Sequence, residues 1–326
     1  MALVESNAGS SKNAVLDREP SKHASTVSAK NVLFATDFSD TSEAALPYAT
    51  AICRRFGATL HTAHVLSDAS LMLMTGGVDY VSMGTIYEDA QTEAKEKLEQ
   101  LSARFEGIPH RSYVRHGQVW KSLAAIIEEN AVDLIVVGTH GRTGLGKLLL
   151  GSVAEDILRH ATCPVLTVGP KVSGHAKLPD FGTPGREVAP LELELRQIVF
   201  ATNFARNAAR AAQEAIALAG EFHARLTAMH VIEDYTQLGS RPGPIEQSVE
   251  KLKNLLADET TLQYLPETVV EFGAPAERIL KVASEREADM IVLGARSSAE
   301  VGTHLPWSAA HHVLAKAHCP VLTIRE

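Results

Sequence analysis

Short apolar runs alternate with longer segments of helical periodicity along most of the chain. Continuous apolar runs are typical of buried strands, and apolar residues at three- and four-residue spacing are typical of helices. In the first half, this pattern predicts strands at 32–35, 59–65, 112–115, 134–137 and 165–168 and helices at 42–56, 88–105, 119–129 and 153–160. Alternating helices and fully apolar strands indicate an α/β fold, in which helices cover both faces of a parallel, doubly wound sheet.

The pattern is repeated, and the repeats share sequence as well as periodicity. NVLFATD at 31–37 matches QIVFATN at 197–203, which is 166 positions further on. CPVLTV at 163–168 matches CPVLTI at 319–324, at an offset of 156. The chain is therefore a tandem duplication, and the smaller second offset indicates extra residues in the first copy, between positions 64 and 88.

Composition divides the chain into four regions. Residues 1–30 are rich in Ser, Asn, Lys and Ala and have no apolar periodicity, so we expect a disordered tail. The two domains are predicted at 31–169 and 196–326. Between them, 170–195 is rich in proline and glycine near its centre and is predicted to be a linker.

Charge and composition exclude several classes of function. The formal net charge is -8 and no run of Lys or Arg is present, which argues against binding to a nucleic-acid backbone. No stretch approaches the roughly 20 apolar residues of a membrane span, and the first residues do not resemble a signal peptide. We therefore expect a cytoplasmic protein that binds neither nucleic acid nor membrane.

The cysteines and histidines do not indicate a metal site. Cys53, Cys163 and Cys319 are odd in number and lack CxxC spacing, so we expect buried thiols in a reducing compartment. His304 and the pair at 311–312 lack the Cys or carboxylate that would complete a recognisable set of ligands.

A glycine-rich segment, GTHGRTGLGKLLLGS at 138–152, follows the fourth predicted strand and leads into a helix. Glycines let backbone N–H groups approach an anion, and a helix start adds unpaired donors and a favourable dipole. Arg142 and Lys147 supply positive charge, and Ser152 supplies a hydroxyl. The segment therefore predicts a site for a phosphate chain.

Two other patterns overlap with this segment. Residues 141–147 read GxxxxGK, but Leu148 follows where a P-loop has the Ser or Thr that holds magnesium, so we reject a P-loop. Ser152 and Glu155 form an S-x-x-E capping box, and Ser152 could simply cap its helix. The capping and phosphate roles are compatible.

The segment resembles the nucleotide-binding signature of the universal stress proteins, G-x2-G-x9-G-[S/T]. The match includes Asp37 at the end of the first predicted strand and Val65 at the end of the second. The resemblance implies a Rossmann-like fold of the adenine nucleotide alpha hydrolase type that binds ATP, with or without Mg²⁺. In such relatives the Asp and neighbouring backbone hold adenine and ribose, and the glycine loop holds the phosphates. The implied binding residues are Ala35, Thr36, Asp37, Val65, Val137, Gly138, His140, Gly141, Arg142, Gly144, Gly151, Ser152 and Val153.

Some of these residues have simpler interpretations. Asp37 could accept from ribose hydroxyls, or it could be only a turn or cap residue. His140 could donate to a phosphate or be merely solvated. The Met-containing insertion at 67–88 is predicted to be a lid or a loop that binds a protein partner, unless it packs across the other domain.

The second copy has lost much of the signature. It has Ser297, Glu300 and Trp307 where the first copy has glycines, and Asn203 in place of Asp37. These exchanges remove backbone freedom, add a negative charge and fill space. We therefore predict that only the first copy binds ATP.

The resemblance implies a regulatory or sensing protein of the stress response. Efficient phosphoryl transfer needs groups that hold a metal and position a nucleophile, and no such set is evident, so we expect no enzyme. A slow ATPase or phosphotransferase and a nucleotide-free assembly or holdase module remain alternatives. Many single-domain relatives pair through their last strands, so we expect 165–168 and 321–324 to meet antiparallel in an intramolecular pseudo-dimer. Further homodimerisation is left open.

Overall fold

The computed structural model describes residues 3–4, 29–67, 80–139, 150–172, 193–233, 243–257, 262–294 and 305–325, with the backbone alone at 3–4, 80–85 and 305–308. The chain forms two compact units, built mainly from residues 28–170 and from residues 194–326. We call them the first and second domain.

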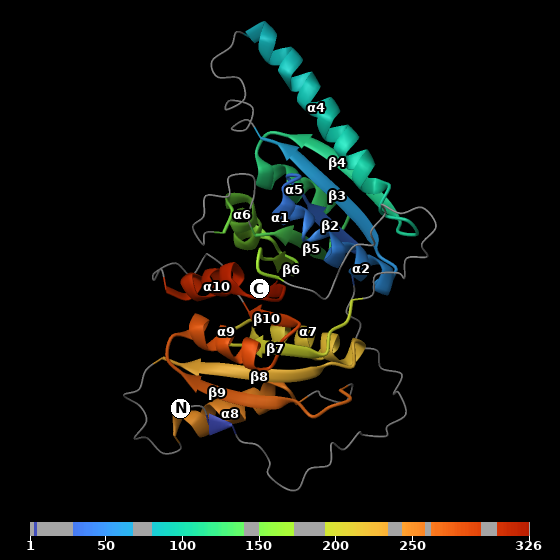
Figure 1. Cartoon of the computed structure of the whole chain (residues 1–326). Coiled ribbons are helices and arrows are strands. Elements are labelled where there is room, and N and C mark those ends of the chain that lie inside the picture. Colours follow the sequence, from blue (N-terminus) through green and yellow to red (C-terminus); the bar gives the residue numbers. More distant parts are fainter. Residues whose placement is uncertain are drawn as a thin grey trace. The chain divides into compact units, whose positions relative to one another are not determined.

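The first domain is a five-stranded parallel sheet with the order β6-β5-β2-β3-β4. Its strands are β2 (Asn31–Ala35), β3 (Thr59–Leu66), β4 (His110–His116), β5 (Leu134–Gly138) and β6 (Val165–Val168). Its helices are α1 (Asp40–Glu43), α2 (Leu46–Phe56), α4 (Tyr80–Ser102), α5 (Val119–Glu129) and α6 (Ser152–His160). Right-handed crossovers put α2 and α4 on one face and α5 and α6, which contact each other, on the opposite face (Figure 1).

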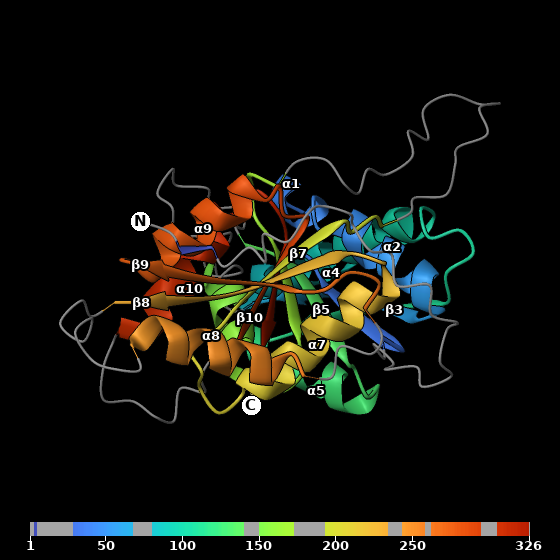
Figure 2. The same cartoon turned by 90° about the horizontal axis from the view of Figure 1, so that it is seen from below.

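The second domain repeats this sheet, with the order β9-β8-β7-β10-β11. Its strands are β7 (Gln197–Ala201), β8 (Arg225–Ile232), β9 (Glu267–Phe272), β10 (Met290–Gly294) and β11 (Val321–Ile324). Its helices are α7 (Ala208–Glu221), α8 (Pro244–Leu255), α9 (Pro275–Glu285) and α10 (Leu305–Lys316). Figure 2 shows α7 and α8 on one side of β8 and β9, with α9 on the other side. The predicted tandem, doubly wound α/β fold is confirmed.

The core lies between the central strands and the helices. Leu33, Phe34 and Ile135 are fully buried in β2 and β5, as continuous apolar strands of a covered sheet should be. From β2 the chain leads outward to β3 and β4, and then crosses back to β5 on the other side of β2. The carboxyl ends of β2 and β5 therefore flank the topological switch point, where ligands of such sheets bind.

Several predicted elements differ from the structure in their bounds. The helix predicted over 42–56 is divided, because Pro47 cannot donate an N–H and its ring clashes with the preceding turn, so α2 starts anew at Leu46. It ends as predicted at Gly57, whose φ of 65° is left-handed. By contrast, α4 begins at Tyr80, so the second part of the predicted loop 67–88 is helical.

The amino-terminal segment also differs in part. Leu3–Val4 form a short strand, β1, which pairs antiparallel with β9 opposite Val270 and Val269. The rest of the tail expected to be disordered, up to residue 28, lies outside the described residues. None of the described helices is long and apolar enough to cross a membrane.

Candidate functional site

Asp37 lies in the turn between β2 and α1, and its carboxylate organises that turn. The backbone N–H and the hydroxyl of Ser39 both donate to Asp37 Oδ1, at 3.0 and 2.6 Å. Ser39 in turn caps α1 by accepting from the N–H of Ser42. The turn role considered for Asp37 is therefore real. The carboxylate is half-buried at the carboxyl end of β2.

Thr36, which was expected to touch the nucleotide, has all of its polar groups engaged within the protein. Its N–H donates to Ala63 O at 2.9 Å, and its carbonyl accepts from His64 Nδ1 at 2.8 Å. Its hydroxyl lies 2.9 Å from Ser42 Oγ and accepts from the N–H of Phe38 at 3.0 Å. Thr36 is thus a residue that holds the turn in place.

Three of the apolar candidates lie at the ends of neighbouring strands. Ala35 and Val137 are paired across β2 and β5 and are 6% and 4% exposed, so their side chains belong to the core. Val65, near the end of β3, is only half-buried. Of the three, Val65 therefore has the most exposed side chain at this edge.

Gly138 has a packing reason to be glycine, which the sequence did not predict. A Cβ there would overlap the carbonyl oxygen of Thr41 and lie 2.9 Å from Thr41 C and 3.0 Å from Ser42 Cα. The glycine lets the end of β5 pack against the backbone of α1. It therefore brings the turn of Asp37 and the start of the glycine-rich segment into direct contact.

The other end of the glycine-rich segment returns to the same edge. Gly151 N–H donates to Thr139 O at 2.7 Å, and Thr139 N–H donates to Val168 O at 3.0 Å. Gly151 is the N-cap of α6 with φ -63° and ψ 147°, a conformation open to any residue. Its backbone conformation therefore does not require glycine at 151, and only a lack of room for a side chain could require it.

The predicted capping box is wrong. Ser152 is the first residue of α6 rather than its cap, and no side chain caps the helix. Glu155 pairs instead with Arg159 at 2.7 Å.

Among the described residues, nothing accepts from the N–H groups of Ser152 and Val153. Unpaired donors in the first turn of a helix favour an anion.

The central part of the segment, 140–149, lies outside the described residues. His140, Gly141, Arg142 and Gly144 therefore stay predictions. The described candidates form one connected edge, in which Asp37, Gly138 and Gly151 are linked through the contacts given above.

The second domain has the same turn but a different helix start. Asn203 Oδ1 accepts from Ala205 N–H at 3.1 Å, as Asp37 accepts from Ser39. At the offset of 156, Ser308 is the counterpart of Ser152, yet α10 already begins at Leu305. The backbone at Trp307 is therefore helical, where its counterpart Gly151 is extended.

A side chain also occupies the switch point of the second domain. Asn207, the counterpart of Thr41, is buried and donates to Ile324 O at 3.0 Å. Its amide atoms would lie 3.2 and 3.3 Å from a Cβ placed on Gly294. In the second domain, the side chain of Asn207 therefore fills the space that the backbone of α1 fills in the first domain.

Sequence reasoning missed a pair of rings in contact beside each turn. Phe38 packs against His64 in the first domain, and Phe204 packs against His230 in the second, each pair in a tilted arrangement. Burial, the largest cause, lowers the pKa of His230 despite its hydrogen bond to the carbonyl of Thr202. The signal was present in the sequence, because both Phe and both His match at the offset of 166.

The cysteines and the carboxyl-terminal histidines are the other groups considered from the sequence. All three cysteines are free and buried, and burial raises the pKa of Cys53 and Cys319 to about 12. Over the described parts of the chain, no group of three or more His, Cys, Asp or Glu side chains could hold a metal ion. His304 lies outside those parts.

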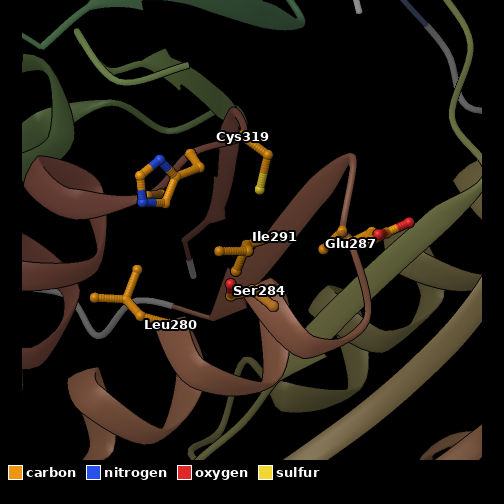
Figure 3. A pocket seen from close by; sticks show the side chains of 9 residues that line it. Leu280, Ser284, Glu287, Ile291 and Cys319 are labelled. Carbon is orange, nitrogen blue, oxygen red and sulfur yellow. The ribbon is translucent and has the colours of Figure 1, made fainter. Parts of the chain in front are cut away.

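A cavity of about 210 Å³ lies in the second domain (Figure 3). Leu280 and Ser284 on α9 and Cys319 lie around it, and Ile291 lies at its floor. Ile291 is near the amino end of β10, whereas the candidate site uses carboxyl ends. The cavity is therefore separate from the counterpart of that site.

Comparison with known proteins indicates the family of both domains. The model of the Universal stress protein family matches residues 28–169 and 194–325. Universal stress protein MJ0577 of Methanocaldococcus jannaschii is 30% identical over 158 residues, covering 44% of this chain and 97% of the relative. Universal stress protein A homolog 1 of Coxiella burnetii is 34% identical over 140 residues, covering 43% of this chain and 95% of the relative. Each relative therefore has the length of one domain of this chain.

A solved structure shares the two-domain fold. A universal stress protein from Archaeoglobus fulgidus matches with a TM-score of 0.68 at 20% identity, covering 91% of this chain and 97% of that chain. At this identity the likeness concerns the fold.

Proposed function

Because the chain belongs to the universal stress protein family, we propose that its first domain binds ATP and that the protein senses or regulates through the bound nucleotide. The observation that carries this proposal is the start of α6. The N–H groups of Ser152 and Val153 find no acceptor among the described residues, and Gly151 beside them offers no side chain to block an anion. This start lies at the same sheet edge as Asp37.

Each part of the site has a distinct role in this proposal. The carboxylate of Asp37 accepts from ribose hydroxyls or adenine-side donors, and Val65 packs against the apolar part of the ligand. The first turn of α6 donates to the phosphates, where helix dipole and unpaired N–H groups act together. His140, Arg142, the glycines at 141 and 144 and Lys147 complete the phosphate side. ATP binds with or without Mg²⁺.

The second domain does not bind ATP in this proposal. Its helix begins three residues before the counterpart of Ser152 and includes Trp307, and Asn203 replaces the carboxylate. A charge-assisted hydrogen bond contributes about 1.5–3 kcal/mol, so losing two or three of them weakens binding by several orders of magnitude. Trp307 adds bulk at the position of Gly151.

Equilibrium dialysis with labelled ATP tests the proposal on two variants of one position. Gly151→Trp should fold and lose ATP, because it puts the second domain's residue where the phosphates approach. Gly151→Ala is the matched control and should keep most of the affinity, because its backbone conformation suits alanine. Equal ATP binding by the Trp variant and the parent would refute the site.

Two further measurements separate the alternatives. The series ATP, ADP, AMP and adenosine should bind with falling affinity, because each step removes anionic oxygens from the α6 start. Release of ADP during the dialysis would favour the slow ATPase. Absence of binding by the parent chain would favour the assembly or holdase module.

A further inference from the structure

Each domain carries the same row of three side chains, Lys, Phe and His, beside the turn that follows its first strand. In the first domain, Lys97 Nζ lies 5.6 Å from the ring centroid of Phe38, which lies 4.5 Å from that of His64. In the second domain, the corresponding distances through Lys251, Phe204 and His230 are 5.3 and 4.4 Å. The interplanar angles of the two ring pairs, 36° and 38°, also agree.

One hydrogen bond fixes the orientation of the imidazole in each row. His64 Nδ1 lies 2.8 Å from the carbonyl oxygen of Thr36, and His230 Nδ1 lies 2.8 Å from that of Thr202. A carbonyl oxygen only accepts, so Nδ1 carries the proton in both domains. The bond sets the orientation of the ring on which the Phe side chain rests.

The Phe residues need such support because of their backbone. Phe38 has φ 61° and Phe204 has φ 59°, in the left-handed region that bulky side chains rarely adopt. Such conformations persist only where the surroundings over-determine them, and they cluster at functional sites. The residue immediately before each Phe is the one at the candidate site, Asp37 in the first domain and Asn203 in the second.

We propose that His64 is a positioning residue of the nucleotide site, which holds Phe38 in its left-handed conformation and thereby aims the carboxylate of Asp37. The inference rests on the proposed function and concerns the same site. His230 holds the equivalent turn in the domain that binds no ATP. The duplication therefore supplies a matched control within one molecule.

The test compares His64→Leu, His64→Asn and His230→Leu in the full chain. Labelled ATP should bind His64→Leu about tenfold more weakly, because binding must then re-order the turn at a cost of about one ordinary hydrogen bond. Asn places an amide N–H at the position of Nδ1, so His64→Asn should recover part of the affinity. His230→Leu should bind ATP as the parent does.

Hydrogen exchange without nucleotide gives the second readout. His64→Leu should speed exchange of the amides of Phe38 and Ser39, whose acceptors belong to the turn. His230→Leu should do so only in the second domain. If His64→Leu does not fold, Phe38→Ala removes the ring but leaves a non-glycine residue at the positive φ without its support, and should give the same two results.

Parental affinity and parental exchange in His64→Leu would overturn the inference. Equal losses of ATP binding in His64→Leu and His230→Leu would also overturn it, because they would indicate general destabilisation. If the parent chain binds no ATP, the proposed function fails, and the exchange of the Phe38 and Ser39 amides still decides whether His64 holds the turn.

Discussion

Gly138→Ala should destabilise the first domain, although it adds a single methyl group. The new Cβ would overlap the carbonyl oxygen of Thr41 and lie 3.0 Å from Ser42 Cα. These are backbone atoms, so α1 must shift as a whole. Overpacking of this kind costs about 1–3 kcal/mol of unfolding free energy.

The duplication again provides the control, Gly294→Ala. There the nearest atoms, at 3.2 and 3.3 Å, are the side-chain amide atoms of Asn207, which can turn away. Turning the Asn207 side chain away would break its hydrogen bond to Ile324 O, which contributes about 1 kcal/mol of stability. We therefore expect Gly294→Ala to cost less than Gly138→Ala.

The two tryptophans allow each domain to be followed separately. Trp120 lies on α5 and stacks on His160 of α6, so a Trp307→Phe background reports the first domain alone. In urea, Gly138→Ala should lower the midpoint of that transition by about 1 M, for a loss of about 2 kcal/mol and an m-value of about 2 kcal/mol per M. The midpoint of Gly294→Ala, read in a Trp120→Phe background, should shift by less. An unchanged midpoint for Gly138→Ala, or a larger shift for Gly294→Ala, would refute the packing argument.

Three further expectations concern groups away from the site. Because burial raises the pKa of Cys53 and Cys319 to about 12, native protein should resist alkylation near neutral pH, whereas in urea all three cysteines should react. Burial, as the largest cause, lowers the pKa of His61 below its ordinary 6.5, so the unfolded chain takes up the proton first. The stability of the first domain should therefore be full above about pH 6.5 and fall as the pH drops below it, which urea midpoints at about pH 7.5 and about pH 5.5 check. If the last strands pair in a pseudo-dimer, the amides of 165–168 and 321–324 should exchange slowly, and fast exchange in either strand would contradict this.

The fold was largely predictable because its central strands are buried on both faces and therefore read as continuous apolar runs. Residues 119–129 and 165–168 were predicted with the bounds that the structure has. Errors arose where local rules compete. The apolar periodicity continues across Pro47, although the helix is interrupted just before it and α2 begins at Leu46. Residues 80–88 look like a glycine- and methionine-bearing loop, although they belong to α4.

Asp37, Gly138 and Gly151 lie at one edge of the sheet, as their positions in the sequence predicted, but the local contacts of these residues were not predicted. A glycine pattern does not reveal that a Cβ at Gly138 would also overlap the backbone of α1. The S-x-x-E pattern at 152–155 gave a false cap because the helix begins one residue earlier than a cap at Ser152 requires. Phe38 was missed because nothing in a sequence marks a bulky residue that adopts a positive φ.

Calorimetric titration of ATP into the full chain tests the central claim most directly, because it counts sites. The account predicts about one ATP per chain for the parent and none for Gly151→Trp. Two sites of comparable affinity in the parent would show that the second domain is intact as a nucleotide site. Absence of heat and of binding in the parent, or one site that persists in Gly151→Trp, would contradict the placement of ATP in the first domain.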